Sequence, residues 1–311
     1  MSVPTVIAAA TARLAGLAEV DAPLGALTTY RVGGRAALLV HVADAAALRT
    51  VTEVAVATGI DVLVVGKGSN LLVADGGFPG LAVVLGEGFA AIDVRGTEVE
   101  VGAAAALPVV ARRTVAAGLT GFEWAVGVPG SVGGAVRMNA GGHGSDMAAC
   151  LDGVRVVDLS TGEDGWVGTA DLHLGYRTSS VEPHHLVLAA RLRLAAGDVD
   201  RGTAELAEIV AWRRAHQPGG PNAGSVFTNP PGDSAGRLID QAGGKGLRRG
   251  TAAVSTKHAN FIQADVGGRA DDVRAVMDAV RALVLAETGV DLEPETRLIG
   301  FRPDPRPVIE G

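Results

Sequence analysis

Residues 127–135 read Gly-Val-Pro-Gly-Ser-Val-Gly-Gly-Ala, and residues 138–141 continue Met-Asn-Ala-Gly. Each glycine in a regular element costs roughly 0.5–1 kcal/mol of backbone entropy relative to alanine. A chain that keeps several glycines in so short a span usually needs its backbone to approach a ligand closely. The stretch therefore predicts a ligand-binding loop.

A second glycine loop lies earlier, at Gly66–Leu72, and reads Gly-Lys-Gly-Ser-Asn-Leu-Leu. It follows an apolar run, Val62–Val65, that predicts a buried strand. Main-chain N–H groups after such a strand can form a concave nest for phosphate oxygens, to which Ser69 and Asn70 add side-chain donors. The loop matches neither the P-loop nor the Rossmann fingerprint, and alone it also fits a tight turn. Two such loops in one domain fit a long diphosphate cofactor between them, and FAD is the best candidate.

Short apolar runs and helical periodicity alternate along the chain. The predicted strands are residues 38–42, 62–65, 81–85, 92–94, 99–101, 153–159, 186–194, 252–254 and 260–264. The predicted helices are residues 5–19, 45–58, 107–117, 204–215 and 271–288. We expect strands 153–159 and 186–194 to pair, and residues 197–200 to form a hinge into a second domain. The mixture indicates an α+β fold rather than a regular doubly wound sheet.

Composition excludes several classes of protein. The 311 residues carry a net charge of −7, which disfavours a nucleic-acid partner, although a local Arg and Lys cluster could still hold an anionic small molecule. Cys150 is the only cysteine, so no intramolecular disulfide is possible, and we expect a small buried side chain. No run of 18 apolar residues predicts a membrane span. Without a basic leader at the start, the natural compartment is the reducing cytoplasm.

Six motifs occur in one order, and together they resemble the UDP-N-acetylenolpyruvoylglucosamine reductase family from about residue 23 to residue 302. They are Thr29–Gly34, Gly66–Leu72, Gly127–Asn139, Gly175–Ser179, Gly224–Pro230 and Pro294–Gly300. The resemblance implies an FAD-binding domain of the vanillyl-alcohol-oxidase (PCMH) type, made of two subdomains, followed by a smaller α+β substrate-binding domain. The implied division is an N-terminal helical segment at 1–22, the FAD-binding domain at 23–196, the substrate domain at 197–302 and a Pro-rich tail at 303–311.

The resemblance also implies the reaction. NADPH would reduce a noncovalent FAD, which would reduce UDP-N-acetylglucosamine enolpyruvate to UDP-N-acetylmuramate in peptidoglycan precursor synthesis. Ser225 matches the family's proton donor, and Arg177 and Glu295 match the pair that supports the developing enol. From chemistry alone these choices are sensible but not unique, because a guanidinium stabilises added negative charge and a carboxyl with a raised pKa can share a proton. Tyr176 and Asn229 match substrate-binding positions.

The cofactor positions are assigned from the two glycine loops. They are Gly66, Lys67, Gly68, Ser69, Asn70, Leu71, Gly127, Val128, Pro129, Gly130, Ser131, Gly133, Gly134, Asn139 and Gly141. A covalent flavin anchor at His143 is not expected, because related oxidases place that histidine in the earlier loop. His184 and His185 have no partner at ligand spacing, so no metal site is predicted.

Two departures separate this chain from many relatives. His216 stands where many carry a lysine, which leaves open whether Arg213, Arg214 or Lys257 meets the substrate phosphates or the nicotinamide. The chain also lacks the inserted tyrosine-bearing loop of one branch, so it resembles the shorter, type II branch. We expect a cytoplasmic monomer that binds a UDP-sugar. The alternatives are an FAD-dependent carbohydrate oxidase of the same superfamily and a flavin-binding scaffold without activity.

Overall fold

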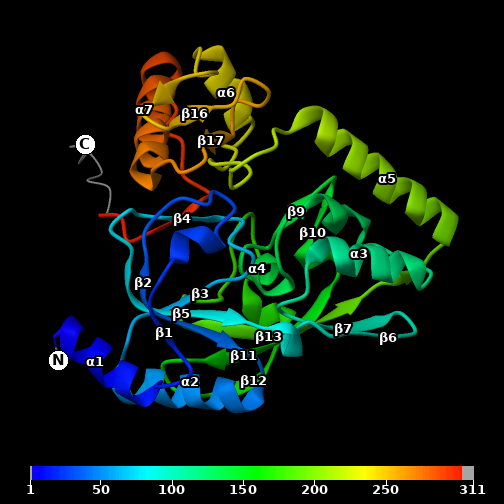
Figure 1. Cartoon of the computed structure of the whole chain (residues 1–311). Helices are drawn as coiled ribbons and strands as arrows, with labels where there is room; N and C mark the ends of the chain where they lie inside the picture. Colours follow the sequence, from blue (N-terminus) through cyan, green and yellow to red (C-terminus); the bar gives the residue numbers. More distant parts are fainter. Residues whose placement is uncertain (1, 303–311) are drawn as a thin grey trace.

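The computed structural model describes residues 2–302, and the predicted tail at 303–311 lies outside them. The chain begins with a four-stranded sheet of order β1-β2-β5-β3, in which β1 is antiparallel and the others are parallel. Its strands are β1 (Glu19–Ala22), β2 (Ala36–Val42), β3 (Val62–Val64) and β5 (Phe78–Leu85). Two helices, α1 (Val3–Arg13) and α2 (Ala45–Thr58), lie along one side of this sheet (Figure 1). Leu14, Val40 and Val51 are buried in the core between them.

The first helix is shorter than the sequence predicted. It ends at Arg13 instead of residue 19, because Gly16 adopts a φ of +81°, which a continuing helix cannot accommodate. Glu19–Ala22 then forms β1 and pairs with β2, so the segment 1–22 is not wholly helical. The second helix matches its predicted bounds, and Gly59 ends it in the left-handed conformation.

A five-stranded antiparallel sheet of order β12-β11-β13-β7-β6 follows. Its strands are β6 (Ile92–Arg95), β7 (Glu98–Gly102), β11 (Leu151–Asp158), β12 (Asp164–Gly168) and β13 (His185–Arg193). The predicted pairing of residues 153–159 with 186–194 is confirmed as β11 against β13. The helices α3 (Leu107–Ala116) and α4 (Val132–Arg137) pack on this sheet, and the short pairs β8 (Leu119–Thr120) with β14 (Ala195–Ala196) and β9 (Gly141–Gly142) with β10 (Ser145–Asp146) lie beside them. Cys150 is buried, as expected.

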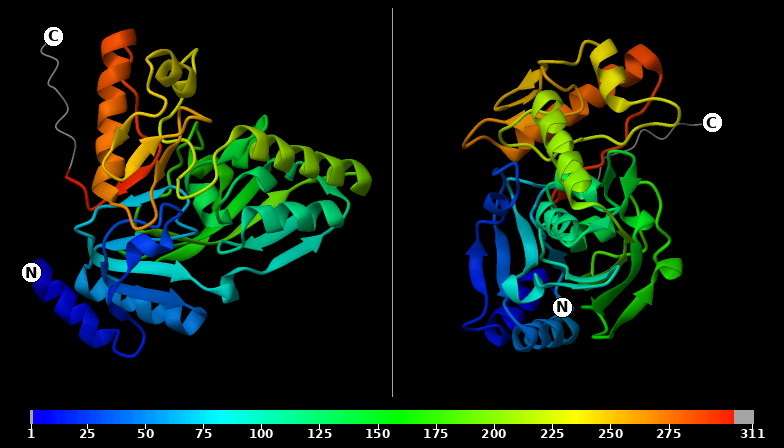
Figure 2. Two further views of the ribbon diagram at one scale, coloured as in Figure 1. Left: turned by 45° about the horizontal axis from the view of Figure 1, so that its top comes forward. Right: turned by 90° about the vertical axis from the view of Figure 1, so that its right-hand side faces the viewer.

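The long helix α5 (Val199–His216) starts within the predicted hinge at 197–200 and lies beside α3 (Figure 2). Leu206 and Ile209 are buried in the same core as Phe122 and Val126, so the helix belongs to the packing of the second subdomain. The division of the chain at residue 197 stays a proposal, and this packing favours a boundary after α5. We call residues 2–216 the N-terminal lobe.

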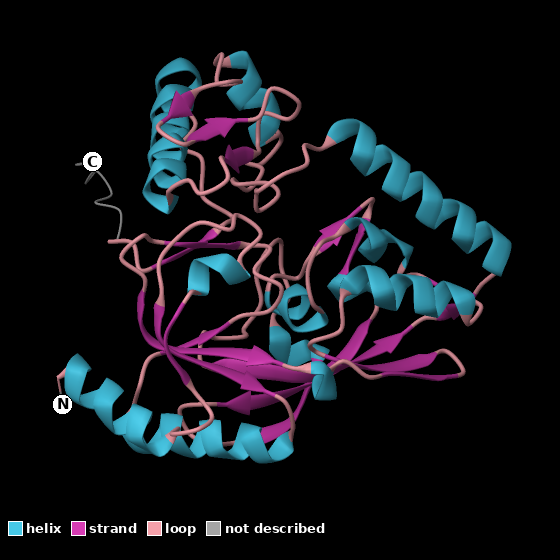
Figure 3. Cartoon of the chain, in the orientation of Figure 1, coloured by secondary structure: helices cyan, strands magenta, loops and turns pink. Residues whose placement is uncertain are grey.

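The C-terminal lobe, residues 217–296, packs around a separate hydrophobic cluster, which also takes in Tyr30, Val32 and Leu72 of the N-terminal lobe. It contains α6 (Ala235–Gln241), α7 (Ala270–Thr288) and a three-stranded antiparallel sheet of β15 (Arg248–Arg249), β16 (Ala252–Val254) and β17 (Ile262–Ala264). The predicted strand at 260–264 begins only at Ile262, because Asn260 makes other contacts described below. Figure 3 shows separate helix-rich and strand-rich layers, which confirm the α+β class.

The end of the chain returns to the N-terminal lobe. Strand β18 (Arg297–Ile299) pairs in parallel with β4 (Leu71–Val73), the strand that leaves the first glycine loop. Figure 1 shows β4 at the boundary between the two lobes. Within residues 2–302, none of the helices has both the length and the apolar character that crossing a membrane requires.

Candidate active site

The two glycine loops lie side by side. A Cβ placed on Gly66 would stand 2.5 Å from Oγ of Ser131, and one on Gly130 would stand 3.3 Å from Oγ of Ser69. Ser131 also begins α4, since its Oγ accepts the N–H of Gly134 at 3.4 Å. The loops predicted to share one ligand are therefore in direct contact.

A cavity opens where the loops meet. Its lining comes from the loops, from strand ends of both sheets and from α4: Val64, Val65, Gly66, Lys67, Val84, Leu85, Ala103, Ala104, Ser131, Gly133, Gly134, Arg137, Val181, His185, Leu186 and Val187. Five of these residues were predicted to bind the cofactor. Main-chain N–H groups of glycines suit phosphate oxygens, and valine and leucine side chains suit a flat ring system.

Arg137 is a site residue that the sequence reasoning missed. It ends α4 and lines the cavity, and burial followed by the nearby charge of Arg297 lowers its pKa. A lowered pKa marks a guanidinium that has lost water, which suits it to an anionic ligand. Arg137 comes only three residues after Gly134 of the Gly-rich stretch, and this spacing could have identified it as a candidate cofactor-binding residue.

The other predicted cofactor residues do not line this cavity: Gly68, Ser69, Asn70, Leu71, Gly127, Val128, Pro129, Gly130, Asn139 and Gly141. Several of these glycines are required by the protein's own packing. A Cβ on Gly68 would stand 2.2 Å from the carbonyl oxygen of Leu27, and Gly68 has a φ of +62°. A Cβ on Gly127 would meet side chains instead, at 2.9 Å from Cγ2 of Ile209 and 3.1 Å from Nε2 of His143. Their contact with a cofactor stays a prediction.

Asn139 is buried and uses its amide on the protein itself. Its Nδ2 donates to the carbonyl of Gly175 at 2.9 Å, and its Oδ1 accepts the N–H of Ala148 at 2.9 Å. It thereby fixes the first residue of the turn that contains Arg177, so its effect on a ligand would pass through that turn.

The turn at Gly175–Thr178 holds Arg177 in the left-handed region, with a φ of +57°. Non-glycine residues seldom adopt this conformation, and the strain is often found at functional sites. Nη2 of Arg177 donates to the carbonyl of Gly141 at 3.2 Å, and Nε lies 2.8 Å from Oε1 of Glu295. The Nε–H does not point along that line, so the contact with Glu295 is an ion pair without an aligned hydrogen bond.

Glu295 is anchored by its main chain to both lobes. Its N–H donates to Val226 at 2.7 Å, and its carbonyl accepts Nδ2 of Asn70 at 3.1 Å. Burial raises the pKa of its carboxyl group, although the nearby positive charge of Arg177 opposes the rise. A carboxyl with a raised pKa beside a guanidinium can hold or share a proton.

Ser225 lies in the segment that pairs with the chain around Glu295. Phe227 bridges Pro294, and the N–H of Thr228 donates to Glu293 at 2.9 Å. Asn260 fixes this segment from the other side, because its amide exchanges two hydrogen bonds with the main chain of Phe227, at 2.8 and 3.0 Å. Ser225 itself is only partly buried. Arg177 thus lies on a turn of the N-terminal lobe, and Ser225 and Glu295 lie on two paired segments of the C-terminal lobe.

The two predicted substrate-binding residues meet across the lobes. The N–H of Asn229 lies 3.5 Å from the hydroxyl of Tyr176, and the guanidinium carbon of Arg177 lies 5.4 Å from the centre of the Tyr176 ring. Tyr176 is 59% exposed, which is high for so large a ring and leaves it accessible to a ligand.

Comparisons with known proteins agree over nearly the whole chain. Residues 36–166 match the model of an FAD binding domain, and residues 216–299 match the C-terminal domain of UDP-N-acetylenolpyruvoylglucosamine reductase. The reductase of that name from Rubrobacter xylanophilus is 40% identical over 290 residues, covering 93% of this chain and 97% of the relative. The one from Heliobacterium modesticaldum is 43% identical over 281 residues, covering 89% of each.

The chain belongs to the UDP-N-acetylenolpyruvoylglucosamine reductase family.

Its structure is also similar to the crystal structure of UDP-N-acetylenolpyruvylglucosamine reductase from Thermus caldophilus, with a TM-score of 0.79 and 37% identity. The similarity covers 91% of this chain and 98% of the other. These findings confirm the resemblance and the expected two-part fold, and they identify an FAD-containing oxidoreductase.

The residues that line the cavity suit FAD in their chemistry. The matched FAD-binding segment contains both glycine loops, whose amides and Ser131 could hold a diphosphate, with Lys67 and Arg137 supplying positive charge. Val64, Val84, Leu85 and Leu186 would flank a ring. His143 is not among the lining residues and contacts Trp212 instead, with ring centres 5.1 Å apart.

Helix α5 ends at His216, the residue left open by the sequence. The ring of His216 stacks on Trp212 at 4.6 Å, and its Nδ1 lies 2.8 Å from the carbonyl of Trp212, so it folds back on its own helix. Nζ of Lys257 donates to the carbonyl of Arg214 at 2.6 Å. Arg213 is partly buried, and this loss of water lowers its pKa, so among the cations near the end of α5 it is the one that is partly desolvated.

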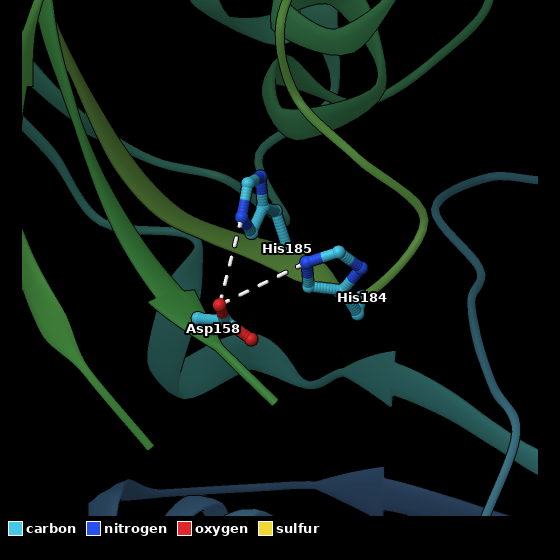
Figure 4. A group of neighbouring side chains, drawn as sticks. All are labelled: Asp158, His184 and His185. Carbon is cyan, nitrogen blue, oxygen red and sulfur yellow. Dashed lines mark ion pairs between the residues drawn. The ribbon is translucent and has the colours of Figure 1, made fainter. Parts of the chain in front are cut away.

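His184 and His185 do have a neighbour, which the sequence did not reveal. Asp158 lies opposite His185 in the β11–β13 pair, and its Oδ2 is 3.8 Å from Nε2 of each histidine (Figure 4). Nδ1 of His185, however, accepts the N–H of Glu182 at 3.0 Å, so the neutral ring carries its proton on Nε2. A protonated ring nitrogen cannot ligate a metal, so Nε2 of His185 does not serve as a ligand in this tautomer.

Proposed function

We propose that this protein reduces UDP-N-acetylglucosamine enolpyruvate to UDP-N-acetylmuramate, with NADPH as the source of hydride, in peptidoglycan precursor synthesis. The observation that carries the proposal is the Arg177–Glu295 ion pair at the junction of the lobes, on the chain segment that pairs with the Ser225 segment. Family membership supports the choice of substrate, since the relatives are named for that reaction.

Noncovalently bound FAD would supply a two-electron carrier that accepts hydride from NADPH and delivers it to the terminal carbon of the enolpyruvyl alkene. Gly66, Lys67, Ser131, Gly133, Gly134 and Arg137 are the residues proposed to hold it. The expected NADPH step and substrate step share one cleft, so NADP⁺ must leave before the UDP-sugar enters.

The protein's own residues act on the charge that hydride addition creates. The alkene electron pair moves onto the carbon next to the carboxylate and forms an enolate-like dianion. Arg177 stabilises this added negative charge, and the carboxyl of Glu295, whose pKa burial raises, supports the enol oxygen as a hydrogen-bond donor.

Ser225 donates the proton that completes the reduction. Its O–H bond breaks as a C–H bond forms at the carbon next to the carboxylate, and the alkoxide takes a proton from solvent. A neutral serine is a weak acid, so it acts only toward a strongly basic carbanion in a site that stabilises the alkoxide. Its partial exposure gives solvent a route for reprotonation.

Tyr176 and Asn229 are proposed to contact the UDP-sugar where the lobes meet, and Arg213 to meet its phosphates in place of the family lysine. The cytoplasmic location and the monomeric state expected from the sequence stay predictions.

Anaerobic stopped-flow spectroscopy of the holoenzyme tests the proposal. NADPH should bleach the flavin absorbance at its longest-wavelength band, and the UDP-enolpyruvyl sugar should restore it without oxygen. An FAD-dependent carbohydrate oxidase would be reoxidised by oxygen and not by this substrate. A flavin-binding scaffold would not respond to NADPH.

A further inference from the structure

Asp75 connects the two lobes through the end of a helix. It lies on the turn after β4, in the N-terminal lobe, while α7 belongs to the C-terminal lobe. Its Oδ1 accepts the N–H of Ala270 at 3.0 Å, and its Oδ2 accepts the N–H of Asp271 at 3.4 Å. Nε of Arg269 lies 3.2 Å from the same Oδ2.

These bonds cap α7 from outside its own lobe. A helix leaves its first N–H groups without partners, and the residue just before the helix usually supplies an acceptor. In α7 that residue is Arg269, which makes no side-chain cap. The Asp75 carboxylate replaces the missing local cap, and its negative charge also suits the positive end of the helix dipole.

The turn that carries Asp75 is fixed by close backbone packing. A Cβ on Gly34 would stand 2.4 Å from the carbonyl oxygen of Asp75, and one on Gly300 would stand 2.1 Å from that of Gly77. A Cβ on Gly33 would likewise stand 2.2 Å from the carbonyl oxygen of Val73. Gly33 and Gly34 therefore let the N-terminal lobe pack closely on the main chain of this turn, which restrains the movement of Asp75 with α7.

Helix α7 in turn packs on the segment that holds Ser225. Val273, Val276 and Met277 of the helix share one core with Val226 and Phe227. Because these side chains are close-packed, a displacement of the start of α7 would also displace the segment that carries Ser225 and Asn229.

We infer that Asp75 is a positioning residue that sets the C-terminal lobe against the N-terminal lobe, in the arrangement in which Asn229 reaches Tyr176. The expected change in KM rests on the proposed function, whereas the expected loss of the helix cap does not. Without the cap, only a fraction of the molecules would hold the lobes in this arrangement. The apparent dissociation constant for the substrate then equals the intrinsic one divided by that fraction. Bound substrate restores the arrangement, so the rate at saturation is largely kept.

The test compares holoenzyme variants Asp75→Ala, Asp75→Asn and Asp278→Ala. Asp278 is the matched control, because its carboxylate pairs with Arg274 four residues away on the same helix. For Asp75→Ala we expect full flavin content, faster hydrogen exchange at residues 270–273, and a KM for the UDP-sugar raised about five- to tenfold with kcat within about twofold. Asp75→Asn keeps one acceptor oxygen, so it should raise KM less. Asp278→Ala should match the wild type in exchange at 270–273 and in KM.

Unchanged exchange in Asp75→Ala would overturn the cap, and faster exchange with unchanged KM would overturn the positioning role. Lost flavin with unchanged KM in the remaining holoenzyme would show a purely structural role. If Asp75→Ala does not fold, Asp75→Asn decides through exchange at Asp271, which should be faster than in the wild type. A wild-type enzyme that does not turn over the UDP-sugar would instead refute the proposed function, while the exchange data would still decide the cap.

Discussion

The side-chain amide of Asn70 donates to the main-chain carbonyl of Glu295 at 3.1 Å, across 225 residues of sequence. The N–H of Arg297 returns a bond to the carbonyl of Asn70 at 3.0 Å. The first glycine loop and the main chain around Glu295 are therefore parts of one hydrogen-bonded unit. A substitution in the loop should therefore alter the position of Glu295, and a substitution near Glu295 should alter the loop.

Replacing Asn70 with alanine tests this unit. The carbonyl of Glu295 would lose its partner, at a cost of about 1 kcal/mol for a typical hydrogen bond. We expect a lower Tm and slower substrate-driven flavin reoxidation, with a smaller effect on flavin reduction by NADPH, because the loss displaces Glu295. Gln263→Ala is the control, since it removes an exposed amide bond to the carbonyl of Gly219. Equal slowing of both half-reactions in Asn70→Ala would contradict the coupling.

Gly68 and Gly76 offer a matched pair of substitutions. A Cβ on Gly68 would clash with Leu27, and its left-handed backbone alone costs an alanine about 1–2 kcal/mol. A Cβ on Gly76, eight residues later, would meet nothing within 4 Å. Gly68→Ala should lower both Tm and the flavin-to-protein ratio, whereas Gly76→Ala should leave both unchanged within about 0.5 kcal/mol of stability. Wild-type Tm and flavin content in Gly68→Ala would show that the loop is not held as described.

The raised pKa of Glu295 predicts how stability depends on pH. A carboxyl whose pKa is higher in the folded state contributes stability that is fully present below its unfolded pKa, about 4.3, and is lost as pH rises through the folded value. Because a glutamine side chain does not titrate, the wild-type Tm should fall relative to that of Glu295→Gln as pH rises across this window. Thermal unfolding from pH 4 upward, with the exposed neighbour substitution Glu293→Gln as the control, measures the difference. A Tm difference that is constant with pH, or that grows in favour of the wild type, would contradict it.

Local patterns were sufficient for elements whose ends are marked in the sequence. Helix α2 could be predicted because Asp44 caps its start and Gly59 ends it. Helix α1 was predicted too long because apolar periodicity continues past Arg13, and only the pairing of β1 with β2 shows that the next segment is a strand. That pairing is a tertiary contact, which a local pattern does not contain.

The sequence named residues for the candidate site but did not predict the contacts that join them. The motifs named Arg177, Ser225 and Glu295. The pairing of β4 with β18 could not be predicted, because each strand has only three residues and the two lie far apart in the sequence. The same reason hid Asp75 and Asp158, whose partners come from other elements. A glycine indicates close backbone contact without identifying the group that makes it, and at Gly68 the structure shows such a contact with Leu27, while contact with a cofactor stays a prediction.

The most direct test of the proposed chemistry is single-turnover kinetics of Ser225→Ala. The hydroxyl is proposed to protonate only the carbanion formed on the substrate, so it has no part in the reduction of flavin by NADPH. Flavin reduction and flavin content should stay near wild type, while anaerobic reoxidation by the UDP-enolpyruvyl sugar should slow by at least about 10²–10⁴, the loss expected for a positioned acid. Reoxidation of Ser225→Ala at the wild-type rate would show that the residue only shapes its turn and would contradict the mechanism.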